Sequence, residues 1–210
     1  MVGSAHPTLY PLSTIHQLMS NSQTPEIEPL SRIQILIAMA VTSIVLFGVA
    51  KLWLYLGDLQ LRPPTMTVEA VGIGIAIGFG LTGLSSIVYA AWATYRESAD
   101  LYLAMVLEPL AMPDLVWLGI LPGLSEELLF RGVMLPSLGL DPIGIVLSSI
   151  CFGVLHMTNL QQWPYAVWAT LVGMLLAFTM VETGNLLIPI IAHVTTNFVS
   201  GLAWKLKARG

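Results

Sequence analysis

Charged residues are scarce in this chain of 210 residues. Asp, Glu, Lys and Arg make up 10% of it, against about 25% in an ordinary soluble domain. Hydrophobic residues account for 56%, and the mean hydropathy is +0.81. This composition excludes a typical soluble domain and predicts an integral membrane protein with the lipid bilayer as its surroundings. The net charge of −4 leaves no basic surface for nucleic acid, so no nucleic-acid partner is expected.

Cysteine and basic N-terminal residues are also nearly missing. Cys151 is the single cysteine, so no intramolecular disulfide can form, and its apolar neighbours predict a buried, inert thiol. Residues 1–31 lack both the basic start of a secretory signal and the arginine richness of a mitochondrial transit peptide. We therefore expect residues 1–31 to form a polar N-terminal tail.

Long apolar stretches follow this tail and predict the fold. A spanning helix needs about 20 mostly apolar residues. Six stretches are assigned as spans: Ile33–Leu56, Val71–Tyr95, Asp114–Leu135, Pro142–His156, Tyr165–Val181 and Leu186–Trp204. Leu101–Leu110 is expected to form a re-entrant or surface helix, and Pro122 to kink the third span. The predicted fold class is thus an all-α polytopic membrane helix bundle with about six transmembrane helices.

This division also gives an expected organisation and orientation. Residues 32–100 would hold the first two spans, and residues 101–210 a helical core. The few basic residues mildly favour a cytoplasmic location for both chain ends. Tryptophan and tyrosine residues near the predicted helix ends, Tyr165 among them, are expected to act as interfacial anchors.

Three of the apolar stretches contain ionisable or amide side chains, which are unusual in a lipid-spanning segment. Glu126, Glu127 and Arg131 occur in one stretch, His156 in the next, and a histidine and an asparagine in the last, at His193 and Asn197. Ionisable groups are costly at bilayer depth, so they mark a functional site by default. At about 1.5 Å rise per residue, the three stretches would bring these side chains to a similar depth, which predicts a shared cavity.

Helical spacing gives the adjacent glutamates different surroundings. Glu127 and Arg131 are four residues apart and share a face, so they can pair. Glu126 is rotated by about 100° from Glu127 and can face a cavity instead. A Glu–Arg pair alone can also be a structural clamp, and a lone membrane histidine or asparagine can simply join helices by hydrogen bonds.

Water activation suits this set of residues. A carboxylate and an imidazole can hold one water, with the carboxylate as its general base. A second histidine with an asparagine amide can stabilise an oxygen that becomes negative during attack on a carbonyl. Two glutamates and two histidines could also ligate zinc, but the chain has no HExxH motif and asparagine is a poor zinc ligand. No metal and no other cofactor is therefore expected.

The pattern resembles the family of CAAX prenyl proteases and bacteriocin-processing proteins, intramembrane glutamic endopeptidases also called the CPBP or ABI family. Its three boxes, EExxxR, FxxxH and HxxxN, match Glu126–Arg131, Phe152–His156 and His193–Asn197 in order. The resemblance covers about Leu115 to Asn197 and places a CPBP-like catalytic core in residues 101–210.

The resemblance implies a role for each matched residue. Glu126 and His156 would activate water, Glu127 and Arg131 would support the site, and His193 with Asn197 would stabilise the oxyanion. The implied activity is metal-independent hydrolysis of a peptide or membrane-protein substrate, in a bacterial inner membrane or an organellar membrane of the thylakoid type. Two alternatives remain open: a non-proteolytic adaptor, immunity or assembly protein within a membrane complex, and a small proton-coupled transporter.

Overall fold

The computed structural model describes residues 30–61, 64–157 and 159–207. In this part of the chain every regular element is a helix, which confirms the all-α bundle. The predicted tail lies outside the described residues except for its last two. The elements are α2 (Arg32–Leu56), α3 (Val68–Ala91), α4 (Ala93–Leu107), η1 (Met112–Asp114), α5 (Leu115–Glu127), η2 (Leu128–Met134), α6 (Leu135–Leu138), α7 (Pro142–Leu155), η3 (Leu160–Gln162), α8 (Trp163–Thr183) and α9 (Leu187–Lys207).

Each predicted span corresponds to a helical segment, although their lengths differ. Four segments are long and apolar enough to cross a membrane: α2, α3, η3 with α8, and α9. The bent pair made by α4 and residues Met112–Leu138 brings the number to five if it is taken as one span. The predicted fourth span is α7, an apolar helix of 14 residues.

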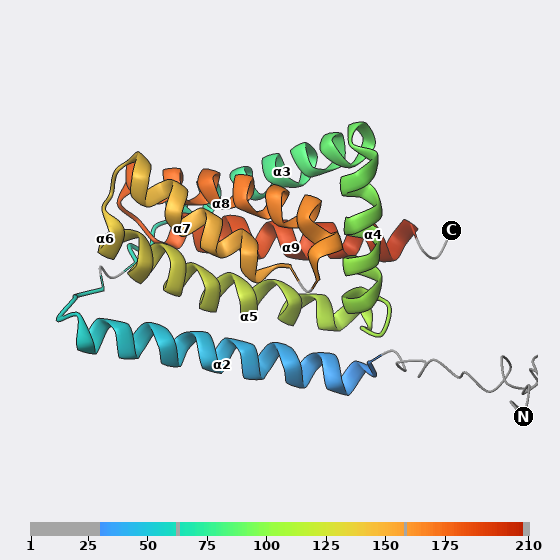
Figure 1. Cartoon of the computed structure of the whole chain (residues 1–210), viewed down its shortest axis with the longest axis horizontal. Helices are drawn as coiled ribbons and strands as arrows, with labels where there is room; N and C mark the ends of the chain where they lie inside the picture. Colours follow the sequence, from blue (N-terminus) through green and yellow to red (C-terminus); the bar gives the residue numbers. More distant parts are fainter. Residues whose placement is uncertain (1–29, 62–63, 158, 208–210) are drawn as a thin grey trace, which may run out of the picture.

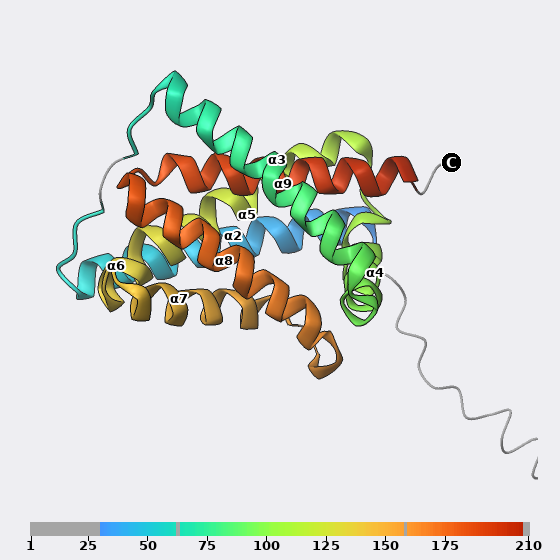
Figure 2. The same ribbon diagram turned by 90° about the horizontal axis from the view of Figure 1, so that it is seen from above.

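The helices lie side by side, except for α4. Figures 1 and 2 show α4 running across one end of the bundle, where α2 begins and α9 ends. The axis changes by 107° between α4 and the following Met112–Leu138 segment. The α2–α3 connection, α6 and the α8–α9 turn lie at the opposite end (Figure 1). The site residues occur on segments between these two ends.

Two predicted boundaries are wrong near α4. The second span was expected to reach Tyr95, but α3 ends at Ala91 because Trp92 is extended, with φ −116° and ψ 96°. Tyr95 belongs to α4 and is buried against Trp168. The helix expected at 101–110 begins at Ala93, so α4 is longer than predicted. The break between α3 and α4 lies beside aromatic packing of α4 against α8. No local sequence period reveals this packing.

The segment that carries the paired glutamates is helical but not uniformly α-helical. α5 runs through Pro122 without ending there. Directly after Glu127 the chain adopts a π-helix over Leu128–Met134, which includes Arg131. Insertions of this kind are rare and often occur at functional sites. The sequence period predicted one plain helix here, so the π-helix is a finding of the structure.

Small residues allow α3 to approach α9 closely. A Cβ atom added at Gly74 would lie 2.7 Å from Ile191 Cβ, and one added at Gly78 would lie 2.5 Å from Thr195 Cβ. The absence of side chains at these two glycines is therefore what permits the close contact.

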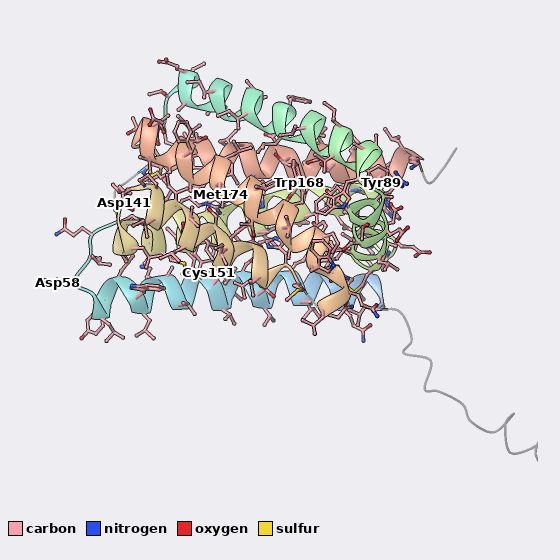
Figure 3. All side chains as sticks on the ribbon, turned by 45° about the horizontal axis from the view of Figure 1, so that its top comes forward. Asp58, Tyr89, Asp141, Cys151, Trp168 and Met174 are labelled. Carbon is pink, nitrogen blue, oxygen red and sulfur yellow. The ribbon has the colours of Figure 1, made fainter. Side chains whose placement is uncertain are left out.

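The prediction of a buried Cys151 is wrong: its side chain is exposed on α7, where Figure 3 labels it. The other face of α7 packs against α8.

Candidate active site

Glu127 is the most enclosed of the six residues selected from the sequence, with none of its surface exposed. Its Oε1 accepts from Arg131 Nη1 at 2.8 Å and contacts His193 Nδ1 at 2.7 Å. A buried carboxylate is tolerated when it is paired with a cation and hydrogen-bonded. Glu127 thus joins the η2 segment to α9.

Arg131 is held on three sides and is 1% exposed. Besides its pair with Glu127, its Nη2 donates to the carbonyl of Gly173 on α8 at 3.0 Å. Its guanidinium carbon lies 4.4 Å from the centre of the Phe152 ring on α7, within the range of a cation–π interaction. Removal of Arg131 would leave the Glu127 carboxylate buried without its cation.

Glu126 has different neighbours, although it is the adjacent residue. Its Oε2 lies 3.7 Å from His156 Nε2 and 4.0 Å from His193 Nε2. Within the part of the chain that the structure describes, this oxygen makes no hydrogen bond. The two carboxylates therefore separate as their helical positions predict, one toward a cation and the other toward two imidazoles.

The partners of the histidines determine which ring nitrogen faces Glu126. His156 Nδ1 lies 2.9 Å from the Phe152 carbonyl, which can only accept, so Nδ1 donates. His193 Nδ1 likewise donates to the Glu127 carboxylate, at 2.7 Å. In both neutral rings Nε2 then carries the lone pair. Both lone pairs converge on Glu126 Oε2, and the three atoms together can bind a proton or a water.

These residues border a cavity of about 980 Å³. Glu126, His156, His193 and Asn197 line it, whereas Glu127 and Arg131 lie behind its wall. Asn197 is half-buried, one helical turn from His193. Among the described residues its amide has no hydrogen-bonding partner, so it can donate to a group in the cavity. The structure thus brings together all six residues selected from the sequence.

Three further residues shape this site and were not selected from the sequence. Tyr102 on α4 and Tyr165 on α8 line the cavity and stack with ring centres 4.5 Å apart. Tyr165, for which the sequence suggested only the part of an interfacial anchor, has its ring 6.3 Å from that of His156. At Gly173 an added Cβ would come within 3.2 Å of both Arg131 and Phe152. No sequence motif marks these contacts, since they depend on how α4 and α8 pack.

The described residues contain no group of three or more His, Cys, Asp or Glu side chains placed to hold a metal ion. Glu127 is already engaged by Arg131 and by His193 Nδ1. At the Glu126 end of the cavity the side chains brought together are one carboxylate, two imidazoles and an amide.

Comparison with known proteins gives two findings. Residues 108–199 match the family of Type II CAAX prenyl endopeptidases described as Rce1-like. This range contains all six site residues, and the match confirms the resemblance drawn from the three boxes. An uncharacterized protein of Bacillus subtilis (strain 168), YpbD, is 34% identical over 83 residues, which are 40% of this chain and 41% of that protein. This chain thus covers less than half of that relative, and no solved structure matches.

Proposed function

We propose, from the family match over residues 108–199, that this protein is an intramembrane endopeptidase in which Glu126 activates the hydrolytic water. The observation that carries the proposal is the position of Glu126 Oε2, 3.7 Å and 4.0 Å from two imidazole nitrogens at the cavity. Glu127 is engaged by Arg131, so Glu126 is the carboxylate free to accept a proton. The substrate is a peptide or membrane protein that reaches the cavity.

The geometry fits a water bound between Glu126 and His156. At 3.7 Å the two atoms are too far apart for a direct hydrogen bond, but one water can bond to both. The water gives a proton to Glu126 while its oxygen bonds to the peptide carbonyl carbon. The tetrahedral intermediate then collapses, the C–N bond breaks, and Glu126 passes the proton to the leaving nitrogen.

The carbonyl oxygen becomes negative in this step and needs donors. Asn197 can supply an N–H from the cavity wall, without change in its protonation. His193 can donate from Nε2 only when its ring is protonated, because its Nδ1 already donates to Glu127. The Glu127 carboxylate would stabilise that imidazolium. His193 and Asn197 are therefore assigned to the oxyanion, with Asn197 as the permanent donor.

The remaining matched residues hold the reacting groups in place. Glu127 fixes the His193 ring through Nδ1, and Arg131 fixes Glu127 while being held by Gly173 and Phe152. A network of this kind keeps catalytic groups in productive positions. The mechanism assigned here is a glutamate mechanism in which no metal takes part.

The proposal is tested with purified protein in lipid and a library of quenched fluorescent peptides. Wild-type protein is expected to cleave some of them, and Glu126→Gln, which keeps the size of the side chain but cannot act as a base, should lose the cleavage. Glu97→Gln on an exposed position of α4 is the matched control and should retain it. Cleavage that persists in both Glu126→Gln and His156→Ala would disprove the assignment.

A further inference from the structure

One face of α9 carries a polar stripe that leads away from the candidate active site. His193, Thr196, Asn197 and Ser200 follow helical spacing and line the cavity, and Lys207 lines it at the end of α9, after the lining residues Gly201, Ala203 and Trp204. His193 and Lys207 are fourteen residues apart, so the stripe is about 21 Å long at 1.5 Å per residue. It joins the buried reacting groups to the end of the bundle where α9 ends.

Helix α3 presents hydroxyl groups to the same cavity. Thr82, Ser85 and Ser86 line it, at spacings of three and four residues that place them on one face. Thr82 Oγ1 donates to Gly78 O at 3.0 Å, and Thr196 Oγ1 donates to Ala192 O at 2.8 Å. Because these hydroxyls use their protons on carbonyls, their lone pairs remain available to accept from water.

Charged and polar groups surround the outer end of this face. Tyr89 OH donates to Asp100 Oδ1 at 2.7 Å, and Lys207 Nζ lies 5.3 Å from the centre of the Tyr89 ring. All three residues line the cavity, and Figure 3 shows Tyr89 close to α4 at the end of the bundle. Asp100 and Lys207 are exposed, so other parts of the protein do not cover the cavity there.

The opposite wall of the outer cavity is different. Near the end of the bundle it is formed by Ile35, Ala38 and Met39 on α2 and by Leu103 and Val106 on α4, which offer no hydrogen bond to water. The hydroxyl groups of Thr42 and Ser43 line the cavity farther along α2. The polar lining of the outer cavity is thus concentrated where α3 and α9 face each other.

We propose that the α3–α9 face of the cavity is the water route that supplies Glu126 from the membrane side on which α9 ends. Water enters beside Asp100 and Lys207, passes the hydroxyl groups of Ser86, Ser200 and Thr82, and reaches His193 and Asn197. Only the use of this water rests on the proposed function: a hydrolase whose reacting groups lie among apolar helices consumes water. Water in the route is a property that can be measured without turnover.

Cysteine accessibility tests the route, because replacing Cys151 by serine removes the single native thiol. In this background, single substitutions Thr82→Cys, Ser86→Cys and Ser200→Cys are placed along the route. The controls Leu84→Cys and Ile87→Cys lie on exposed positions of α3 outside the cavity. Sealed vesicles are treated with a charged, membrane-impermeant methanethiosulfonate from the side of the α9 end, and labelling is followed by mass spectrometry.

The thiolate is the reacting form and needs water, so route positions are expected to label at least about tenfold faster than the controls. Ser200→Leu, which places an apolar side chain in the route, should slow labelling of Thr82→Cys and leave Ile87→Cys unchanged. Equal rates at route and control positions, or no effect of Ser200→Leu on Thr82→Cys, would overturn the route. Fast labelling in a protein that cleaves no peptide would instead disprove the hydrolase and leave the route standing.

Discussion

At the scale of single residues, two neighbouring glutamates of identical chemistry have different surroundings because the helix turns by about 100° between them. Glu127 is fully buried and bonded to Arg131 and His193. Glu126 faces two imidazole nitrogens at the cavity. Environments that differ in this way can divide two carboxyl groups into a reacting group and a structural one.

Loss of Arg131 should affect stability as well as activity. Arg131→Ala leaves the Glu127 carboxylate buried without its cation, which costs about 3–5 kcal/mol in comparable buried pairs. Lys51→Ala removes an exposed cation on α2 and should change stability by less than about 0.5 kcal/mol. Thermal or denaturant unfolding in detergent measures both variants. If the two were equally stable, Arg131 would not have the supporting role assigned to it.

Chelators provide a second test at this scale. The proposed mechanism uses Glu126, His156 and water, so cleavage should persist after treatment with EDTA or 1,10-phenanthroline. The rate of peptide cleavage before and after treatment is the measurement. Activity that is lost on chelation and restored by zinc would replace the glutamate mechanism with metal catalysis.

At the scale of elements, the side chains that share one face of a helix could be predicted from the sequence. The packing of one helix against another could not. The period of four residues predicted the Glu127–Arg131 pair, which the structure contains. It did not predict the π-helix around Arg131, because a change of hydrogen-bonding pattern leaves no periodic signal in one turn. The end of α3 at Ala91 and the contact of Tyr165 with Tyr102 depend on aromatic packing across helices, which local sequence cannot show.

The α3–α9 contact gives a prediction with a matched control on the same helix. A Cβ added at Gly78 would come within 2.5 Å of Thr195 Cβ, whereas one added at Gly80 would meet nothing within 4 Å. Gly78→Ala should therefore force the helices apart and lower the unfolding temperature. Gly80→Ala should be neutral or stabilise by up to about 1 kcal/mol through helix propensity. Thermal unfolding distinguishes the two, and equal unfolding temperatures would contradict the close contact.

At the scale of the whole molecule, the three boxes lie far apart in the sequence, yet the bundle brings them to one cavity. α5 and α7 run antiparallel (Figure 1), and the bundle places His156 and His193 within 3.7 and 4.0 Å of Glu126. Similar depth could be estimated from 1.5 Å per residue. A shared cavity follows from this depth, but its walls could not be predicted, because they include Tyr102 on α4 and Tyr165 on α8.

The arrangement of the ends predicts sidedness in a membrane. Arg32 and Lys207 lie at the same end of the bundle, and Asp58 lies at the other (Figures 1 and 3). With the orientation favoured by the positive-inside rule, Glu108→Cys near the α4 end should label from the cytoplasmic side and Asp58→Cys from the opposite side. Impermeant maleimide applied to intact and opened cells measures this. The reverse pattern would invert the orientation.

The central claim is that Glu126 performs peptide hydrolysis within the membrane. The most direct measurement compares the new peptide termini in membranes of cells that express the wild-type chain with those in cells that express Glu126→Ala at the same level. We expect a set of cleaved membrane peptides that is present with the wild type, absent with Glu126→Ala and retained with Glu97→Ala. An identical set of termini in all three would contradict the claim.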